Sequence, residues 1–183
     1  MRLLLVNLCS DPLSELEFVK PLERRLKRHK IDFRTRHYTK IAYEDVKSSN
    51  KVIICGTALK DGEFLKDLSW FTPLDEGDKP ILGIGSGSQA IMKFFNEKLI
   101  DEMRIGMFKV TLVKENKLTD KKSFYAYFLT KKIVKTAIFF EILARIEEAA
   151  CMVKHKYKEV YGCFFHPEVM NPEIILNFIL KVN

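Results

Sequence analysis

The stretch Pro80-Ile-Leu-Gly-Ile-Gly-Ser-Gly-Ser-Gln-Ala-Ile91 decides the fold. It begins as a short apolar run, passes through a cluster of glycines and serines, and continues as the start of a helix. Many α/β enzymes mount a nucleophile on such a strand-to-helix elbow, which needs small residues two positions before and after the tip because larger side chains would collide there. Gly83 and Gly87 meet this requirement around Gly85, so Gly85 is predicted at the tip.

The other registers fit less well. Ser86 at the tip would be flanked by Ile84, which is too large, and Ser88 lies at the predicted helix entrance, where serine commonly caps. Glycine adopts a positive φ at little cost, so Gly85 relaxes the elbow. It also leaves the elbow without a side chain that could attack a substrate.

The first half of the chain alternates short apolar runs with amphipathic segments, which predicts parallel strands joined by helices. Ser14 is predicted to cap the first helix, with Glu17 completing a capping box, and Pro21 to kink that helix or shift its start. The predicted strands are 2–7, 32–38, 51–55 and 79–84, and the predicted helices are 14–30, 43–48, 63–71 and 88–98.

After about residue 104 the pattern changes to strands with few helices between them. We therefore expect one α/β domain, residues 1–183, with three layers, a mostly parallel doubly wound sheet and an antiparallel annex. The predicted elements of this second half are strands 107–113, 123–129, 137–146 and 160–165 and a final helix opened by Asn171-Pro-Glu173.

Composition excludes several classes of protein. With 47% hydrophobic and 30% charged residues, the chain is typical of a globular protein and not of a disordered one. No apolar run has a membrane span's length, and the first strand begins at once without room for a signal peptide, so we expect a cytoplasmic protein without a membrane partner. The four cysteines show no metal-site spacing, so neither a metal nor another cofactor is predicted.

The net charge of +7 raises the question of a polyanionic partner. The clearest basic run, residues 24–30, belongs to a predicted helix whose apolar residues recur every four positions, which favours a solvated helix face over a nucleic-acid site. The chain also contains a single glutamine, Gln89, and this avoidance of a labile amide is typical of thermophilic proteins.

A second motif follows the last predicted strand. In Gly162-Cys-Phe-Phe-His-Pro-Glu168, His166 ends a strand, and Glu168 could accept a hydrogen bond from one imidazole nitrogen and leave the other facing a nucleophile. On its own, such a histidine could equally be a structural residue.

Taken together, the two motifs resemble the class I, or triad-type, glutamine amidotransferases over essentially the whole chain. The elbow of that family reads P-[ILV]-L-G-[IV]-C-x-G-x-Q, and its C-terminal motif reads G-x-Q-F-H-P-E. The small glutaminase subunits of archaeal GMP synthetases are the most similar subgroup. The resemblance implies a flavodoxin-like fold, glutamine or another small amide as ligand, and a partner that is a synthetase subunit.

Roles carried over by position would make His166 the general base and Glu168 the residue that orients it. Gly56 and the N–H of Ser86 would hold the oxyanion, and Gln89 would line the glutamine site. The nucleophile position is Gly85, which cannot attack. The chain also departs from the family in its substrate-holding segments: residues 55–58 keep one glycine of the oxyanion loop, residues 127–132 lack the S-H-x-D motif, and residues 105–108 lack a carboxylate.

Three functions remain open. The favoured one is a degenerate glutaminase scaffold with a binding or regulatory role, in which Gly85→Cys would restore some hydrolysis if the rest of the site is intact. The second is an active amidotransferase or amide hydrolase with a displaced nucleophile, Ser86 or Cys55, and His166 as its base. The third is a basic module that binds a polyanion through residues 24–30 and 131–132.

Overall fold

One mixed sheet of nine strands, in the order β2-β1-β3-β4-β9-β8-β7-β5-β6, organises the molecule. The computed structural model describes all residues from Met1 to Asn183. The strands are β1 Arg2–Asn7, β2 Asp32–His37, β3 Lys51–Ile54, β4 Ile81–Ile84, β5 Ile100–Leu112, β6 Ser123–Ile133, β7 Phe140–Ile146, β8 Ala149–His155 and β9 Val160–Cys163. The helices are α1 Pro12–Phe18, α2 Lys20–Arg28, α3 Tyr43–Lys47, α4 Thr72–Glu76, α5 Ser86–Phe94, α6 Pro167–Met170 and α7 Pro172–Lys181.

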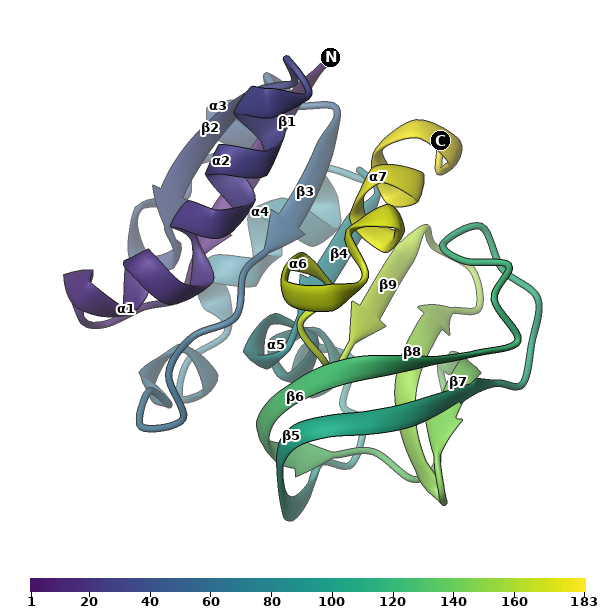
Figure 1. The fold of residues 1–183 in the computed structure, drawn as a ribbon. Helices are drawn as coiled ribbons and strands as arrows, with labels where there is room; N and C mark the ends of the chain where they lie inside the picture. The colour runs from purple at the N-terminus through teal and green to yellow at the C-terminus, as the bar shows by residue number, and fades with distance from the viewer.

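The five strands from β2 to β9 in this order are parallel, and β8, β7, β5 and β6 continue the sheet with antiparallel pairing. Helices α2 and α7 lie in front of the parallel strands, and α3, α4 and α5 lie behind them (Figure 1). This confirms the predicted α/β fold with its antiparallel annex. Strands β1, β3, β4 and β9 are buried along almost their whole length, as expected for a sheet covered on both faces.

The annex curls back toward the parallel half. Val134, just beyond β6, forms an isolated bridge with Ala150 of β8. Farther back along β6, the carbonyl oxygen of Tyr127 accepts a 2.8 Å hydrogen bond from the N–H of His166, which follows β9. Strand β6 therefore runs beside the end of β9 and closes one side of the elbow region.

Two buried links tie separate elements together. The ammonium group of Lys51, at the start of β3, donates hydrogen bonds to the carbonyl oxygens of Phe178, Ile179 and Val182 at the end of α7. A cation there also matches the negative end of the helix dipole. Gln89 of α5 donates to the hydroxyl of Thr130 on β6 over 2.9 Å.

The N-terminal helix differs from its prediction. Asp11, not Ser14, caps it: the Asp11 carboxylate accepts from the N–H of Leu13 over 2.9 Å, and Pro12 takes the first helical position. The predicted helix over 14–30 is two helices separated at Val19, because Pro21 has no N–H to continue the first one.

Other element predictions were also wrong in part. The segment 63–71 forms two 3-10 turns separated by Asp67, whose carboxylate accepts from the N–H and hydroxyl of Ser69 in place of a helical bond. Helix α4 and strand β8 had not been predicted. The helix after the elbow begins at Ser86, two residues early, and β5 begins at Ile100, seven residues early.

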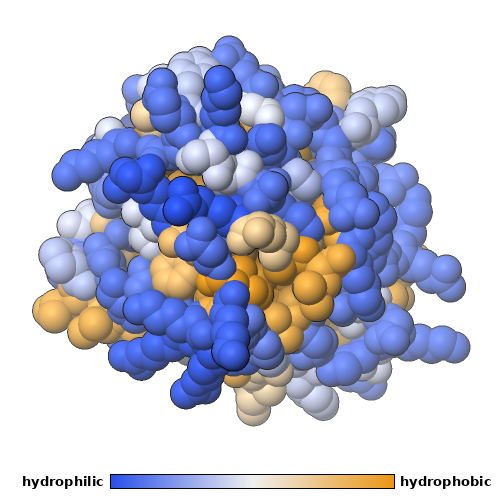
Figure 2. Space-filling model, turned by 90° about the horizontal axis from the view of Figure 1, so that it is seen from above, coloured by the Kyte–Doolittle hydropathy of each residue, from blue (hydrophilic) through white to orange (hydrophobic).

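The surface is mixed in polarity. Viewed from above, hydrophilic side chains surround a smaller apolar area (Figure 2). Elsewhere, Met103, Ile105 and Met107 project from one face of β5 and are each more than half exposed. None of the helices is both long enough and apolar enough to cross a lipid bilayer.

His155, at the end of β8, is predicted to make stability depend on pH. Its buried ring accepts hydrogen bonds through Nδ1 from the N–H groups of Tyr157 and Lys158, at 3.2 and 3.1 Å. Burial, followed by the charges of Lys158 and Lys154, lowers the pKa of His155 below the ordinary 6.5. The unfolded chain therefore binds this proton more readily, and the contribution of His155, complete above pH 6.5, is lost as the pH falls below it.

The measurement is the free energy of unfolding in urea between pH 7.5 and pH 5, for the wild type and for His155→Gln. Because other groups titrate in both proteins, the expectation is that the wild type loses more stability than the variant on acidification. Parallel curves for the two proteins would contradict it.

Candidate active site

The elbow forms as the sequence predicts, with Gly85 between β4 and α5. Gly85 has φ 53° and ψ −113°, a backbone conformation that favours glycine. Its N–H donates to the carbonyl oxygen of Cys163 over 2.7 Å, which fixes the elbow against the end of β9. The flanking glycines are needed for space: a Cβ at Gly83 would lie 2.7 Å from the backbone of Gly87, and one at Gly87 would lie 2.3 Å from the carbonyl oxygen of Ile54.

His166 lies directly against this elbow. A Cβ at Gly85 would be 2.8 Å from Nε2 and 2.9 Å from Cε1 of His166, which is closer than real Cβ atoms approach other groups. A Cβ at Gly56, on the loop after β3, would be 2.6 Å from Cε1 of the same ring. The imidazole therefore occupies a slot between two glycines, and it fills space that a side chain at position 85 would need.

The ring is held from several sides. Nδ1 of His166 is 2.8 Å from a carboxylate oxygen of Glu168, and since a carboxylate can only accept, Nδ1 is the donor. The ring of Phe18 packs at a tilt against the imidazole, with 5.6 Å between the two ring centroids. The backbone N–H of His166 donates to the carbonyl oxygen of Tyr127. Both His166 and Glu168 are buried, at 2% and 6% exposure.

The second imidazole nitrogen, Nε2, has no hydrogen-bond partner although it is buried. Buried polar atoms are nearly always paired, so Nε2 is free to accept a hydrogen bond from a group outside the chain. Here Nε2 faces the backbone of Gly85, where a side chain would begin. The predicted histidine and carboxylate, His166 and Glu168, thus lie together. The position that His166 faces, Gly85, has no side chain.

Neither displaced nucleophile is bonded to His166. The Nε2 atom has no partner, so it contacts neither the hydroxyl of Ser86 nor the thiol of Cys55 as a hydrogen-bond acceptor. Cys55 is fully buried, and burial raises the pKa of its thiol well above 9.0, which disfavours the reactive thiolate. The hydroxyl of Ser88 lies 2.9 and 2.8 Å from the carbonyl oxygens of Gly83 and Cys163, so it joins the elbow to the sheet.

A pocket of about 220 Å³ opens beside the elbow. Ser86 and Gln89 of α5 line it, together with the loop 58–62 after β3 and Lys131 and Lys132 of β6. This brings two of the predicted site residues to one pocket. The lysines had been considered as part of a polyanion surface, and they end the segment 127–132 that lacks the family's S-H-x-D motif. Their place opposite α5 depends on the return of β6.

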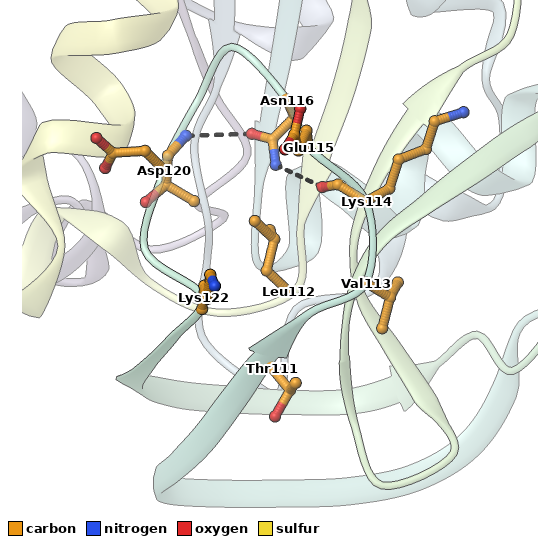
Figure 3. A pocket seen from close by; sticks show the side chains of 9 residues that line it. Thr111, Leu112, Val113, Lys114, Glu115, Asn116, Asp120 and Lys122 are labelled. Atoms are coloured by element: carbon orange, nitrogen blue, oxygen red, sulfur yellow. Dashed lines mark hydrogen bonds between the residues drawn. The ribbon is translucent and has the colours of Figure 1, made fainter.

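A larger pocket, about 530 Å³, is elsewhere, in the turn between β5 and β6 (Figure 3). The amide of Asn116 closes this turn: its oxygen accepts from the N–H groups of Leu118 and Thr119, and its nitrogen donates to the carbonyl oxygen of Lys114. The polar groups of the Asn116 side chain thus serve the loop itself, and none of the predicted site residues lines this pocket.

The predicted solvated basic face on α2 holds for most of its side chains. Phe18, Leu22 and Leu26 are buried, and Arg24, Lys27 and Arg28 are exposed. Arg25 differs: its guanidinium lies 3.4 Å from the carbonyl oxygen of Glu168, so it reaches toward the histidine-bearing turn.

Comparison with known families agrees with this geometry. The model of the family "Glutamine amidotransferase class-I" matches residues 14–181. The chain belongs to this family. The match includes both the elbow and the His166 turn, so the class I amidotransferase resemblance seen in the two motifs is confirmed.

Two curated relatives are named as glutamine-hydrolysing GMP synthases or a subunit of one. This class I amidotransferase chain is 37% identical over 110 residues to one subunit of a glutamine-hydrolysing GMP synthase from Methanococcus aeolicus, covering 54% of this chain and 58% of that one. It is 33% identical over 114 residues to a glutamine-hydrolysing GMP synthase from Francisella philomiragia, covering 56% of this chain and 22% of that protein. The alignments thus span little more than half of the first relative and less than a quarter of the second.

Among solved structures, the fold is similar to that of a protein from Thermoplasma acidophilum that is described as one subunit of a GMP synthase. The TM-score is 0.84 with 19% identity, covering 98% of this chain and 92% of that one. At this identity the similarity establishes the fold alone.

Because the His166 ring fills the space beside Gly85, we expect any side chain at position 85 to lower the stability of the fold. Gly85→Ala is expected to lower the free energy of unfolding by roughly 2–4 kcal/mol, because the alanine is strained at positive φ and its Cβ meets His166. Gly62→Ala is the matched control: Gly62 has negative φ with open space around it, so its change should stay within about 0.5 kcal/mol.

A double-mutant cycle separates the two causes. If the imidazole is responsible for part of the cost, Gly85→Ala should be less destabilising in a His166→Ala background than in the wild type. Equal costs in both backgrounds would show that backbone strain alone penalises the alanine.

Proposed function

We propose that this chain is a class I glutamine amidotransferase domain that does not hydrolyse glutamine and acts by binding. The observation that carries the proposal is the contact between His166 and Gly85: the ring that would serve a nucleophile occupies part of the volume in which that nucleophile would stand. Covalent catalysis needs an attacking atom within reach of its base. Here the buried Nε2 finds none.

The proposal extends to a partner. Two curated relatives are named as glutamine-hydrolysing GMP synthases, one of them as a single subunit of such an enzyme. A domain of this family without a nucleophile would keep the shape that fits a synthetase-type subunit. We infer that it occupies such a subunit's glutaminase position in a binding or regulatory role. The polyanion-binding alternative stays a prediction.

The direct test measures glutamate release from glutamine by the purified protein, alone and with the synthetase subunit of a GMP synthase. Removal of a covalent nucleophile typically lowers the rate by about 10³-fold or more, so the wild type and His166→Ala should both match the protein-free blank. Turnover that His166→Ala abolishes would overturn the proposal and indicate a displaced nucleophile. Binding to the synthetase subunit, measured by calorimetry in the same samples, tests the partner.

Gly85→Cys is the sharper variant, and the structure changes what we expect of it. The motifs alone predict recovery of some hydrolysis, but the new Cβ would stand 2.8 Å from Nε2, so the ring has to move before a thiol can be placed beside it. We expect Gly85→Cys to fold with reduced stability and to release no more glutamate than the wild type. Recovered turnover would mean that the ring retreats and that the pocket accepts glutamine.

A further inference from the structure

The pocket beside the elbow has an unusual charge for a site that would hold an amino acid. Six of the residues that line it are polar or charged: Lys60, Asp61, Ser86, Gln89, Lys131 and Lys132. Three are lysines and one is an aspartate. A free amino acid brings an ammonium group as well as a carboxylate, and an ammonium group needs acceptors that this lining has few of.

The three lysines differ in whether they already form ion pairs with carboxylates of the chain. Lys131 is exposed and forms no ion pair. Lys132 pairs with Asp101, which is itself 85% exposed in its side chain, and Lys60 pairs with Asp11 at 3.4 Å. Ion pairs this exposed are weak, so both ammonium groups can turn toward a bound anion at little cost.

The single carboxylate of the pocket is engaged elsewhere. One oxygen of Asp61 accepts from the hydroxyl of Ser10, and the other accepts from the hydroxyl of Thr57 and from the N–H of Ser10. Burial acts to raise the pKa of Asp61, but these bonds, with the charge of Lys60, leave the pKa lowered. Asp61 is therefore an ionised group that organises the loop, with little capacity left for a ligand's ammonium group.

The α5 side of the pocket offers donors. Ser86 is 6% exposed, its side chain lines the pocket, and its hydroxyl has no hydrogen-bond partner within the chain. Ser86 is also the first residue of α5, where the backbone N–H groups lack intrahelical acceptors and the helix dipole is positive. Ser86, the start of α5 and the three lysines thus border one small cavity.

We propose that this pocket binds a small dianion, a dicarboxylate or a phosphate-bearing acid, in preference to glutamine. The inference rests on the proposed function, because a site that no longer hydrolyses glutamine has no need to bind it. Lys131, Lys132 and Lys60 supply the charge, and Ser86 with the start of α5 supplies directed hydrogen bonds. Gln89 holds β6 in place over the pocket, since its amide nitrogen donates to Thr130 beside the lysines.

The test is calorimetric titration of the full chain with glutarate, inorganic phosphate and L-glutamine at 50 mM NaCl. Glutarate keeps the five-carbon chain of glutamine but carries two negative charges and no ammonium group. We expect glutarate, phosphate or both to bind at least ten-fold more tightly than glutamine, and binding to weaken at 300 mM NaCl. The two anions distinguish a dicarboxylate site from a phosphate site.

Variants locate the binding. Lys131→Met and Ser86→Ala should each weaken anion binding at least five-fold. Lys98→Met is the matched control, because Lys98 is exposed beyond the opposite end of α5 and should leave binding unchanged. Thermal unfolding of each variant confirms that it is folded before titration.

The titrations either support or overturn the inference that the pocket prefers a dianion to glutamine. Anion binding that Lys131→Met weakens and Lys98→Met does not supports the inference. Equal or tighter binding of glutamine, no binding of either anion at 10 mM, or binding that Lys98→Met weakens as much as Lys131→Met overturns it. Glutamate release is measured on the same samples: glutamine binding without hydrolysis defeats only this inference, whereas hydrolysis defeats the proposed function as well.

Discussion

The contact between the imidazole of His166 and the bare backbone of Gly85 and Gly56 is the constraint on which the site depends. Two glycines on neighbouring strand ends open a slot, and the ring fills it. Elements from the whole chain converge on that ring: Phe18 from α1, Tyr127 from β6, and Glu168 from α6. The antiparallel annex is therefore part of the site, because β6 supplies the carbonyl group that fixes the backbone of His166.

The same contact explains how a histidine–carboxylate pair is held opposite a position that carries no side chain. The pair is buried, and Glu168 satisfies Nδ1, so removing the carboxylate would leave a second unpaired nitrogen in the protein interior. Glycine at the elbow also accepts φ 53° without the strain that another residue would carry. The pair thus fits a structural role.

The sequence predicted the parallel half of the fold well and the annex less well. It predicted that the elbow and the His166 turn would lie together, but not the distances between them. Glycine spacing and proline placed the elbow and the His166 turn, whereas β8 was missed because it is buried on both faces and shows no alternation. Spacing could not show that the ring of His166 lies against the backbone of Gly85, because the slot for the ring also depends on Gly56 from a separate loop. Nor could it bring Lys131 and Lys132 opposite Ser86, since that follows from the curl of the annex.

Gly83 and Gly87 have a consequence for how such chains are recognised. Both are required by the close approach of α5 to the sheet, with a carbonyl oxygen of β3 only 2.3 Å from a Cβ at Gly87, whether or not anything reacts at the tip. Architecture alone would preserve these two glycines in a lineage that had abandoned the chemistry. These two glycines therefore indicate only that a chain descends from this family. The side chain at the tip of the elbow, between them, indicates whether the chain can catalyse the reaction.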